Sequence, residues 1–449
     1  MRQAVGITGI GTVCGLGVGI DALWDGLCAP RSAIAPIRSF DASGLRARLG
    51  SEVPEFGVRD SVPKSYRKAT KVMCRDTELA VVAARLAALD AGLRTRGSED
   101  GDEGFELSGE RLGCHIGAGL IAAETGELGR AQSTAVDGSG AFSIRAWGTV
   151  GEEAAGGMDN LTPLWMLKYL PNMPACHVTI VHGAEGPSNT ITCFETSGLL
   201  SVGESVRVIE RGGADVCFSG GTESKLNPVG MLRLEHAGRL ALVGEERDGA
   251  GVVRPYDEGA EGGVAGEGAG ILCVESIEHA RARDARVYAQ VAGFGAAQSV
   301  EGVDALYGEA EDSGQGLSDA IERALGDAGI APGQVDAIVP GAQGVRSLDR
   351  AEAAALRRVF GDRLGEIPLV TLCPNIGSCV AGQGGLQIGV AAACLRRQTL
   401  PGRIHGGSPA DGLQAGASDP RDARLTNVLV CASGLGGQNA AVVLRRADD

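Results

Sequence analysis

A turn between a predicted strand and a predicted helix carries two residues whose side chains could do chemistry. Residues 186–198 read GPSNTITCFETSG, which places Cys193 just before the turn and Glu195 within it. The start of a helix offers unpaired N–H groups and the positive end of the helix dipole, and both stabilise an anionic side chain. A thiolate at this place could act as a nucleophile. A carboxylate cannot hold an acyl group as a thioester, so Glu195 argues against nucleophilic catalysis through a thioester at this position.

The elements that position this turn alternate between apolar strands and amphipathic helices, and this order predicts an α/β architecture. The first strand is expected over residues 4–10. The helix after Glu195 has an apolar inner face at helical spacing, formed by Leu199, Val202, Val206 and Ile209. Similar elements recur from residue 266 onward. We therefore predict two related halves, residues 1–260 and 261–449.

An earlier helix is expected in the first half, with Asp76 as its N-terminal cap. Gly92 would end this helix, because glycine is favoured just after a helix. Its buried face is predicted to consist of Leu79, Val82, Leu86 and Leu89.

Composition and charge exclude several classes of protein. The net charge of −15 argues against binding to nucleic acid, which needs a basic surface. No run of about 18 apolar residues suggests a membrane span, and the first residues lack the layout of a signal peptide. Most of the 12 cysteines lie in apolar runs, as in a reduced cytoplasmic protein. The spacing of Cys373 and Cys379 does not fit a zinc site, so we expect neither a metal nor a cofactor.

Seven short motifs occur in an order that resembles the β-ketoacyl synthases, or ketosynthases, of the thiolase fold. They are ITGIG (7–11), FDASGL (40–45), GPS (186–188), GGTE (220–223), RPYD (254–257), GEGAG (266–270) and GLGGQN (434–439). The resemblance covers nearly the whole chain. It implies a five-layered αβαβα sandwich of two related halves, usually dimeric, with the active site near the dimer interface.

An active member of that family needs a nucleophilic thiol, two histidines that serve the malonyl unit, and a lysine that orders the site. By the resemblance, Glu195 stands at the nucleophile position. Gly341 or Ala342 stands at the first histidine position, Cys373 at the lysine position and Ser378 at the second histidine position. All four catalytic groups are thus replaced while the scaffold motifs remain.

Other sequence features bear on the same site. Ser433 takes the place of a gating phenylalanine, with Leu435 two positions on. Of the six histidines, His177 and His182 come closest in sequence and are expected to flank a strand as structural imidazoles. Cys193 could be the nucleophile only if the turn were shifted; otherwise it is a buried strand residue.

With these catalytic groups replaced together, the sequence resembles the chain length factors, or ketosynthase β-subunits, of type II polyketide synthases. Those proteins pair with an active ketosynthase α-subunit and usually carry glutamine at the cysteine position, so Glu195 is a departure. The resemblance implies a non-catalytic subunit of a heterodimer that elongates carrier-bound polyketide or fatty acyl chains by decarboxylative Claisen condensation. The alternatives are a stand-alone acyl decarboxylase or hydrolase that uses Glu195, and a non-catalytic acyl-binding scaffold.

Three roles are open to Glu195 at the nucleophile position. Its carboxylate could accept hydrogen bonds from the N–H groups of the helix start, worth about 0.3–1 kcal/mol. It could line a pocket and contact a partner or the growing chain. It could also act as an acid or base if desolvation raised its pKa, although the missing histidines would leave an enolate unsupported.

The resemblance also suggests two surfaces for partners. In chain length factors a tunnel for the growing chain follows the heterodimer interface. The candidate tunnel and interface residues here are Ile121, Glu124, Leu128, Ser433 and Leu435, with ordinary interface packing as the alternative. A basic cluster lies where ketosynthases dock an acidic acyl carrier protein, and it comprises Lys64, Arg67, Lys68, Lys71 and Arg75. A solvated helix face is the alternative for this cluster, and the partner subunit could dock the carrier instead.

Overall fold

The computed structural model describes residues 3–29, 31–98, 105–148, 156–299 and 313–447. Within them, twelve strands form one mixed sheet. Its main strands are β1 (Val5–Cys14), β7 (Leu112–Ala118), β8 (Ser188–Ile191), β9 (Val216–Ser224), β10 (Ala265–Ser276), β11 (Ala289–Gln298), β12 (Ala337–Val339), β15 (Asn427–Ser433) and β16 (Gln438–Arg446). Three short strands extend it, namely β2 (Gly17–Val18), β3 (Ala35–Pro36) and β4 (Leu49–Ser51). Two small sheets pair β5 (Leu93–Arg94) with β6 (Phe105–Glu106), and β13 (Thr399–Leu400) with β14 (Arg421–Asp422).

The two halves of the sheet repeat one strand order. In the first half the order is β8-β7-β9-β10-β1, and in the second it is β12-β15-β16-β11, with residue 369 bridged in parallel to β12. Parallel and antiparallel pairings also correspond, since β7–β9 and β12–β15 are parallel whereas β10–β1 and β16–β11 are antiparallel. The repeat groups β10 with the first half. We therefore propose to move the division from residues 260/261 into the segment between β10 and β11.

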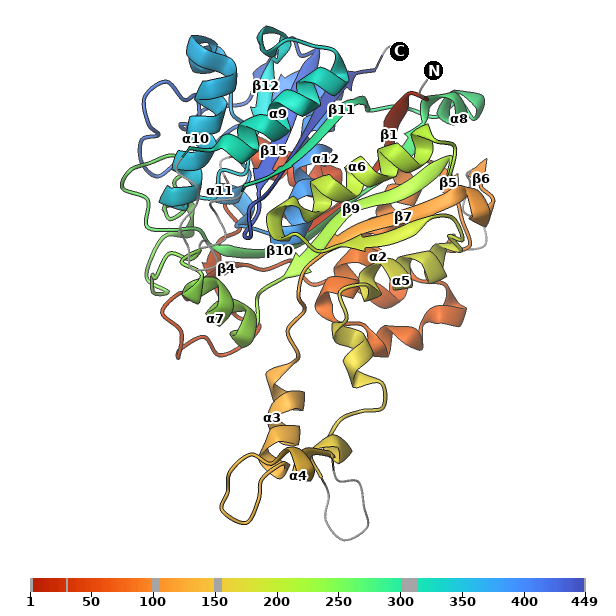
Figure 1. Cartoon of the computed structure of the whole chain (residues 1–449), viewed down its shortest axis with the longest axis vertical. Coiled ribbons are helices and arrows are strands. Elements are labelled where there is room, and N and C mark those ends of the chain that lie inside the picture. Colours follow the sequence, from red (N-terminus) through yellow and green to blue (C-terminus); the bar gives the residue numbers. More distant parts are fainter. Residues whose placement is uncertain (1–2, 30, 99–104, 149–155, 300–312, 448–449) are drawn as a thin grey trace.

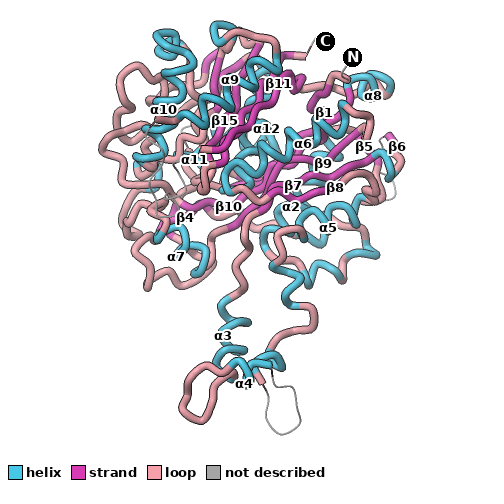
Figure 2. Tube along the Cα trace, viewed as in Figure 1, coloured by secondary structure: helices cyan, strands magenta, loops and turns pink. Residues whose placement is uncertain are grey.

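The helices complete the layers. They are α1 (Ile20–Cys28), α2 (Arg75–Asp90), α3 (Thr125–Thr134), α4 (Ile144–Gly148), α5 (Met173–His182), α6 (Ser197–Glu210), α7 (Pro228–His236), α8 (Ile277–Ala282), α9 (Gln315–Ala328), α10 (Arg346–Phe360), α11 (Cys373–Ile376) and α12 (Gln383–Arg397). The helices α6 and α12 pack on each other between the two halves of the sheet. On the outside, α2 with α5 covers the first half and α9 with α10 covers the second (Figures 1 and 2). This arrangement is the predicted five-layered αβαβα sandwich.

Burial on both faces explains the sequence of the central elements. All ten residues of β1 are buried, and they form a nearly continuous run of apolar residues and glycines. Thirteen of the fifteen residues of α12 are buried, and this helix is built from small residues that allow close approach to its neighbours.

The helix predictions were confirmed for α6 and partly wrong for α2. Leu199, Val202, Val206 and Ile209 of α6 are all buried. The cap of α2 is Cys74 rather than Asp76, which lies buried in the first turn and accepts a hydrogen bond from Ser224 N. Leu89 is 47% exposed, because the helix turns this residue away from the sheet near its end.

Between β7 and α5 the chain leaves the body as an arm that includes α3 and α4 (Figure 1). The arm starts where β7 ends at Ala118, so it departs from the carboxyl ends of β7 and its parallel neighbours. None of the described helices is both long and apolar enough to cross a lipid bilayer.

Candidate functional site

Positions that the resemblance assigns to the active site lie at one edge of the sheet. Glu195 follows the end of β8, Gly341 follows the end of β12, and Ser433 is the last residue of β15. The carboxyl ends of parallel strands are where ligands bind in open α/β sheets. This edge is where the sequence places the site, and its role stays a prediction.

Glu195 sits in a 3₁₀ turn, η7 (Phe194–Thr196), that leads directly into α6. Its side chain is buried, and Oε2 accepts a hydrogen bond from the backbone N–H of Leu435 at 3.0 Å. The N-cap residues of η7 and α6 are Cys193 and Thr196, so Glu195 occupies neither cap position. The structural interpretation of Glu195 predicted partners at the start of the helix, whereas the hydrogen bond described for its carboxylate comes from a loop 240 residues away.

Cys193 is not placed as a nucleophile. It precedes η7, where its N–H donates to Ser197 Oγ at 2.8 Å and its carbonyl accepts from Thr196 Oγ1 at 2.7 Å. Burial raises the pKa of its thiol, so the reactive thiolate is disfavoured. It is half-buried in the approach to the turn rather than buried in strand β8.

The loop at the first histidine position is held by two buried carboxylates of α10. Glu352 accepts from Gly341 N at 2.8 Å and from Ala342 N at 2.9 Å. Asp349 accepts from the N–H groups of Gln343, Gly344 and Tyr256 at 2.9–3.1 Å. Burial raises the pKa of Asp349 to about 8 and also raises that of Glu352. Sequence analysis missed this clamp, although acids three residues apart beside a glycine-containing loop were a usable signal.

Cys373 lies beside this loop. It opens α11 and its Sγ donates to Gly341 O at 3.4 Å. Burial raises the pKa of Cys373 far above its usual value, with smaller contributions from the carboxylates of Asp349, Glu352 and Glu195, in that order. The structure thus brings Cys373 and Gly341 into contact, and neither offers an imidazole or an ammonium group.

Ser378 is held at the same edge by its backbone. Its N–H donates to Val264 O and its carbonyl accepts from Gly266 N, both at 2.8 Å. Its side chain is half-buried. A serine hydroxyl does not titrate near neutral pH and cannot replace an imidazole as a general base on its own.

Three residues near the replaced positions keep a strained backbone. Phe194 has φ 49°, Ala342 has φ 45° and Val380 has φ 45°. The left-handed region costs a non-glycine residue about 1–3 kcal/mol, and such strain clusters at functional sites. Backbone strain is thus concentrated at the edge of the sheet where the resemblance places the active site.

The glycine loop after β15 packs directly on the Glu195 turn. A Cβ at Gly434 would lie 2.7 Å from Cys193 O, so only glycine fits this contact. The Ser433 hydroxyl donates to Asn439 Oδ1 at 2.6 Å, and Asn439 Nδ2 donates to Ser299 Oγ at 2.9 Å. Ser433 is thus fixed in a polar network, and Leu435 presents its N–H to Glu195.

The buried histidines have structural partners away from this site. His177 and His182 lie in α5 and do not flank a strand as predicted. Their Nδ1 atoms contact Tyr66 OH at 2.8 Å and Thr95 Oγ1 at 2.7 Å. Burial lowers the pKa of His177 to about 4 and that of His182 to about 3, so both are neutral at pH 7. No group of acids, cysteines and histidines suited to a metal ion occurs in the described part of the chain.

The tunnel candidates of the arm lie near its root. Ile121 is buried in a small cluster with Cys74 and Tyr169. Glu124 precedes α3 with its side chain exposed, and Leu128 is half-buried on α3. Whether these residues line a tunnel stays a prediction.

The carrier-docking candidates do not share one helix face. Lys64 lies in the 3₁₀ turn η2 (Lys64–Tyr66), Lys71 lies in η3 (Ala69–Val72), and Arg67 and Lys68 link the two turns. Lys64, Lys68 and Lys71 are exposed, whereas Arg67 is half-buried and donates to Arg59 O. Arg75 does not belong to this surface, because it pairs with the buried Glu267 at 2.6 Å. A role in docking stays a prediction for the remaining four residues.

Comparison with known proteins identifies the family. Residues 2–280 match the N-terminal domain of β-ketoacyl synthases, and residues 288–406 match the C-terminal domain. The chain therefore belongs to the β-ketoacyl synthase family. It is 31% identical over 449 residues to the tetracenomycin polyketide synthase ketoacyl synthase beta subunit of Streptomyces glaucescens, covering 98% of each chain. It is 29% identical over 455 residues to 3-oxoacyl-[acyl-carrier-protein] synthase 2 of Coxiella burnetii, covering both chains completely.

Solved structures agree with the fold. The ishigamide ketosynthase/chain length factor superimposes with a TM-score of 0.82 at 25% identity, over 100% of both chains. A type II polyketide synthase acyl carrier protein in complex with its ketosynthase bound to the hexaketide gives a TM-score of 0.83 at 22% identity, also over 100% of both chains. The relatives thus include proteins named as synthases and one named as a beta subunit.

Proposed function

We propose that this chain is a non-catalytic ketosynthase-like subunit of the chain length factor type. It would form a heterodimer with an active ketosynthase and shape the site in which carrier-bound polyketide or fatty acyl chains are elongated by decarboxylative Claisen condensation. The partner would supply the nucleophilic cysteine. The cytoplasmic location expected from the sequence stays a prediction.

The observation that carries this proposal is the buried Glu195 at the start of α6. Acyl transfer in this family's chemistry requires a thiolate that forms a thioester. Glu195 provides no such atom, and Cys373, the thiol beside the Gly341 loop, is buried and held as a neutral thiol. The 31% identity to a ketoacyl synthase beta subunit supports the same assignment.

The contact of Glu195 with Leu435 also argues against a stand-alone decarboxylase. An enolate or tetrahedral oxyanion needs backbone N–H donors that are free to receive it. The Leu435 N–H is used by the Glu195 carboxylate, whose negative charge would repel an incoming oxyanion. The nearby replaced positions, Gly341 and Ser378, offer no imidazole to compensate.

The arm supports the expectation of a protein partner. Within the described residues, eight of the fourteen exposed large apolar side chains fall between residues 120 and 167. They include Phe142, Ile144 and Met166, which are 59%, 75% and 60% exposed. Exposed apolar groups gathered in one region mark interaction surfaces in soluble proteins.

Co-expression with an intact ketosynthase from the same source tests the proposal. We expect a stable 1:1 complex and little homodimer of either chain. The double substitution Ile144→Glu/Met166→Glu should weaken the complex at least tenfold, because it places charges in an apolar interface. The matched control is Leu232→Glu on α7, which is 43% exposed and lies outside the arm. A homodimer of this chain that does not bind an intact ketosynthase would refute the proposal.

A further inference from the structure

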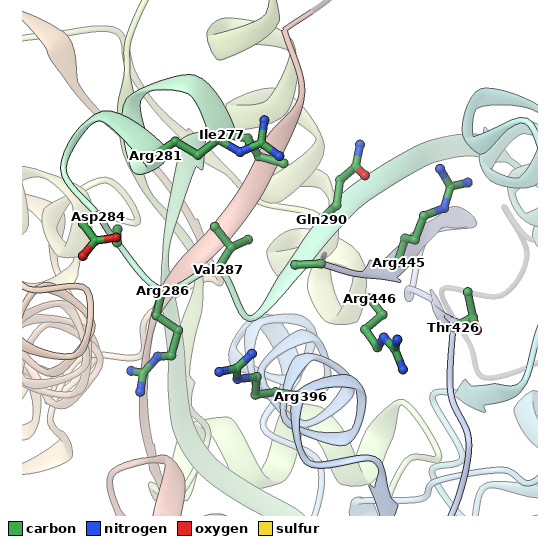
Figure 3. A pocket seen from close by; sticks show the side chains of 12 residues that line it. Ile277, Arg281, Asp284, Arg286, Val287, Gln290, Arg396, Thr426, Arg445 and Arg446 are labelled. Atoms are coloured by element: carbon green, nitrogen blue, oxygen red, sulfur yellow. The ribbon is translucent and has the colours of Figure 1, made fainter. Parts of the chain in front are cut away.

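A second concave site lies away from the replaced catalytic positions. It is an open cleft of about 810 Å³. Five arginines from four parts of the chain line it, as Figure 3 shows: Arg281, Arg286, Arg396, Arg445 and Arg446. Among the residues that the structure describes, Asp284 is the one acidic residue of the lining. This concentration of positive charge is notable in a chain whose net charge is −15.

The cleft sits at the seam between the two halves. Arg281 belongs to α8, Arg286 to the connection into β11, and Arg445 and Arg446 to the end of β16. The seam itself is formed by β1 and β11, which pair at Gly6↔Gln290. Junctions between structural units are frequent places for small-molecule sites.

The cleft is remote from Glu195. The strand β16 begins at Gln438, beside the loop that contacts Glu195, and ends at Arg446 in the cleft. Eight steps of about 3.3 Å put the two ends of this strand roughly 26 Å apart. The arginines therefore serve neither the replaced catalytic site nor its entrance.

Two of the arginines are held in place by protein contacts. Arg286 Nη2 pairs with Asp90 at 2.5 Å and its guanidinium stacks over the Tyr288 ring at 4.4 Å. Arg445 donates to Ala328 O at 2.9 Å and to Asn427 Oδ1 at 3.3 Å. These contacts orient the two guanidinium groups at the wall of the cleft without a ligand.

Two other arginines are available to a ligand. In the parts of the chain that the structure describes, neither the Arg281 nor the Arg446 guanidinium has a hydrogen bond or an ion pair, and both residues are exposed. The cleft thus combines two oriented guanidinium groups with two that can close on a ligand.

We propose that this cleft binds a small anion that carries at least two phosphate groups. Guanidinium groups match phosphate oxygens in bidentate geometry. Asp90 balances the charge of Arg286. Arg281, Arg445 and Arg446 together exceed the single charge of Asp284 by two, so a ligand with more than one negative charge is needed to balance their mutual repulsion. The volume lies within the range of about 300–1,000 Å³ that is usual for small-molecule sites. A nucleic acid is disfavoured by the acidic charge of the rest of the surface.

Calorimetric titration of the full chain with inorganic pyrophosphate at low salt tests the proposal. We expect saturable 1:1 binding that is at least tenfold tighter than binding of orthophosphate. The single substitutions Arg281→Gln and Arg446→Gln should each weaken binding about tenfold. The substitution Asp284→Asn should tighten it severalfold, and asparagine tolerates the positive φ of 55° at this residue. A gain of affinity cannot arise from misfolding.

The matched control is Arg233→Gln on α7, an exposed arginine outside the cleft, which should leave the affinity unchanged. Three results would each overturn the proposal. They are the absence of saturable pyrophosphate binding, equal affinity in wild type and in both cleft arginine variants, and tighter binding of a hexa-aspartate peptide than of pyrophosphate. The last result would identify an acidic protein segment as the ligand.

Discussion

The backbone N–H of Leu435 donates to Glu195 Oε2 at 3.0 Å and thereby joins two loops that are 240 residues apart in the chain. One loop starts helix α6 in the first half, and the other connects β15 to β16 in the second. The carboxylate thus takes up a backbone donor that an acyl-transfer site would reserve for an oxyanion. In this chain the contact links one loop of each half at the edge of the sheet.

Removing the Glu195 side chain should destabilise the protein measurably. Glu195→Ala leaves the N–H of the half-buried Leu435 without its acceptor, which costs about 1 kcal/mol or more of unfolding free energy. Glu195→Gln keeps an acceptor oxygen and should cost less than about 1 kcal/mol. Denaturant unfolding of both variants gives the comparison, with the exposed Glu110→Ala as control. Equal stability of Glu195→Ala and wild type would show that the contact does not hold the loops.

The buried carboxylate of Asp349 on α10 should contribute more to the free energy of unfolding than Glu195 does. Asp349→Ala would leave three backbone N–H groups unpaired, those of Tyr256, Gln343 and Gly344. At about 1 kcal/mol or more for each, we expect a loss of at least ~3 kcal/mol. Asp349→Asn retains one acceptor oxygen and should lose clearly less. The free energy of unfolding is the measurement, and Glu322→Ala on the exposed face of α9 is the control. A loss below about 1 kcal/mol for Asp349→Ala would contradict the clamp.

Acid should destabilise the fold through His182. Burial lowers its pKa in the folded state to about 3, from 6.5 when unfolded. Between these values the unfolded state binds the extra proton, so stability is lost as pH falls below about 6.5. The slope is about 1.4 kcal/mol per pH unit for one group. Asp76 and Asp349 have raised pKa values of about 7 and 8 and act in the opposite direction.

A comparison of variants isolates the histidine from these acids. His182→Gln should remove close to one proton from the pH slope of unfolding free energy between pH 6 and 4, because glutamine does not titrate. His236→Gln changes an exposed histidine of α7 and should leave the slope as it is. Identical slopes in wild type and His182→Gln would mean that the imidazole is not held neutral in the fold.

Much of this structure could be predicted from the sequence because apolar patterns and glycine motifs are local. The inner face of α6 and the strand–turn–helix around Glu195 were read correctly from spacing alone. The cap of α2 was not, because Asp76 satisfies its oxygen with Ser224 N of β9, and only tertiary structure brings them together. The partner of Glu195 was missed for the same reason, since Leu435 lies in the other half.

The pattern of charges along the sequence does not predict which charged side chains are buried or gathered in one place. Arg75 lies at the end of a basic cluster in sequence, yet it turns inward to Glu267. The arginines that line the cleft between the two halves come from separate segments between residues 281 and 446, so no local sequence pattern predicts that they lie together. Three-dimensional proximity of distant segments is what sequence inspection lacks in both cases.

The three exposed lysines Lys64, Lys68 and Lys71 should contribute to docking of an acyl carrier protein if this chain shares in that contact. Changing all three to glutamate should raise the dissociation constant of an acidic carrier at least tenfold and reduce its dependence on salt. Arg233→Glu on α7 serves as the charge control. Unchanged carrier affinity of the heterodimer would assign docking to the partner subunit and refute a role for this surface.

The central claim is tested most directly by determining which subunit supplies the catalytic cysteine. The measurement is decarboxylative condensation of carrier-bound substrates by the purified complex of this chain with an intact ketosynthase. We predict that Cys→Ala at the partner's nucleophile abolishes condensation, whereas Glu195→Gln in this chain leaves at least half of it. Turnover of a malonyl carrier by this chain alone, lost on Glu195→Gln, would contradict the claim.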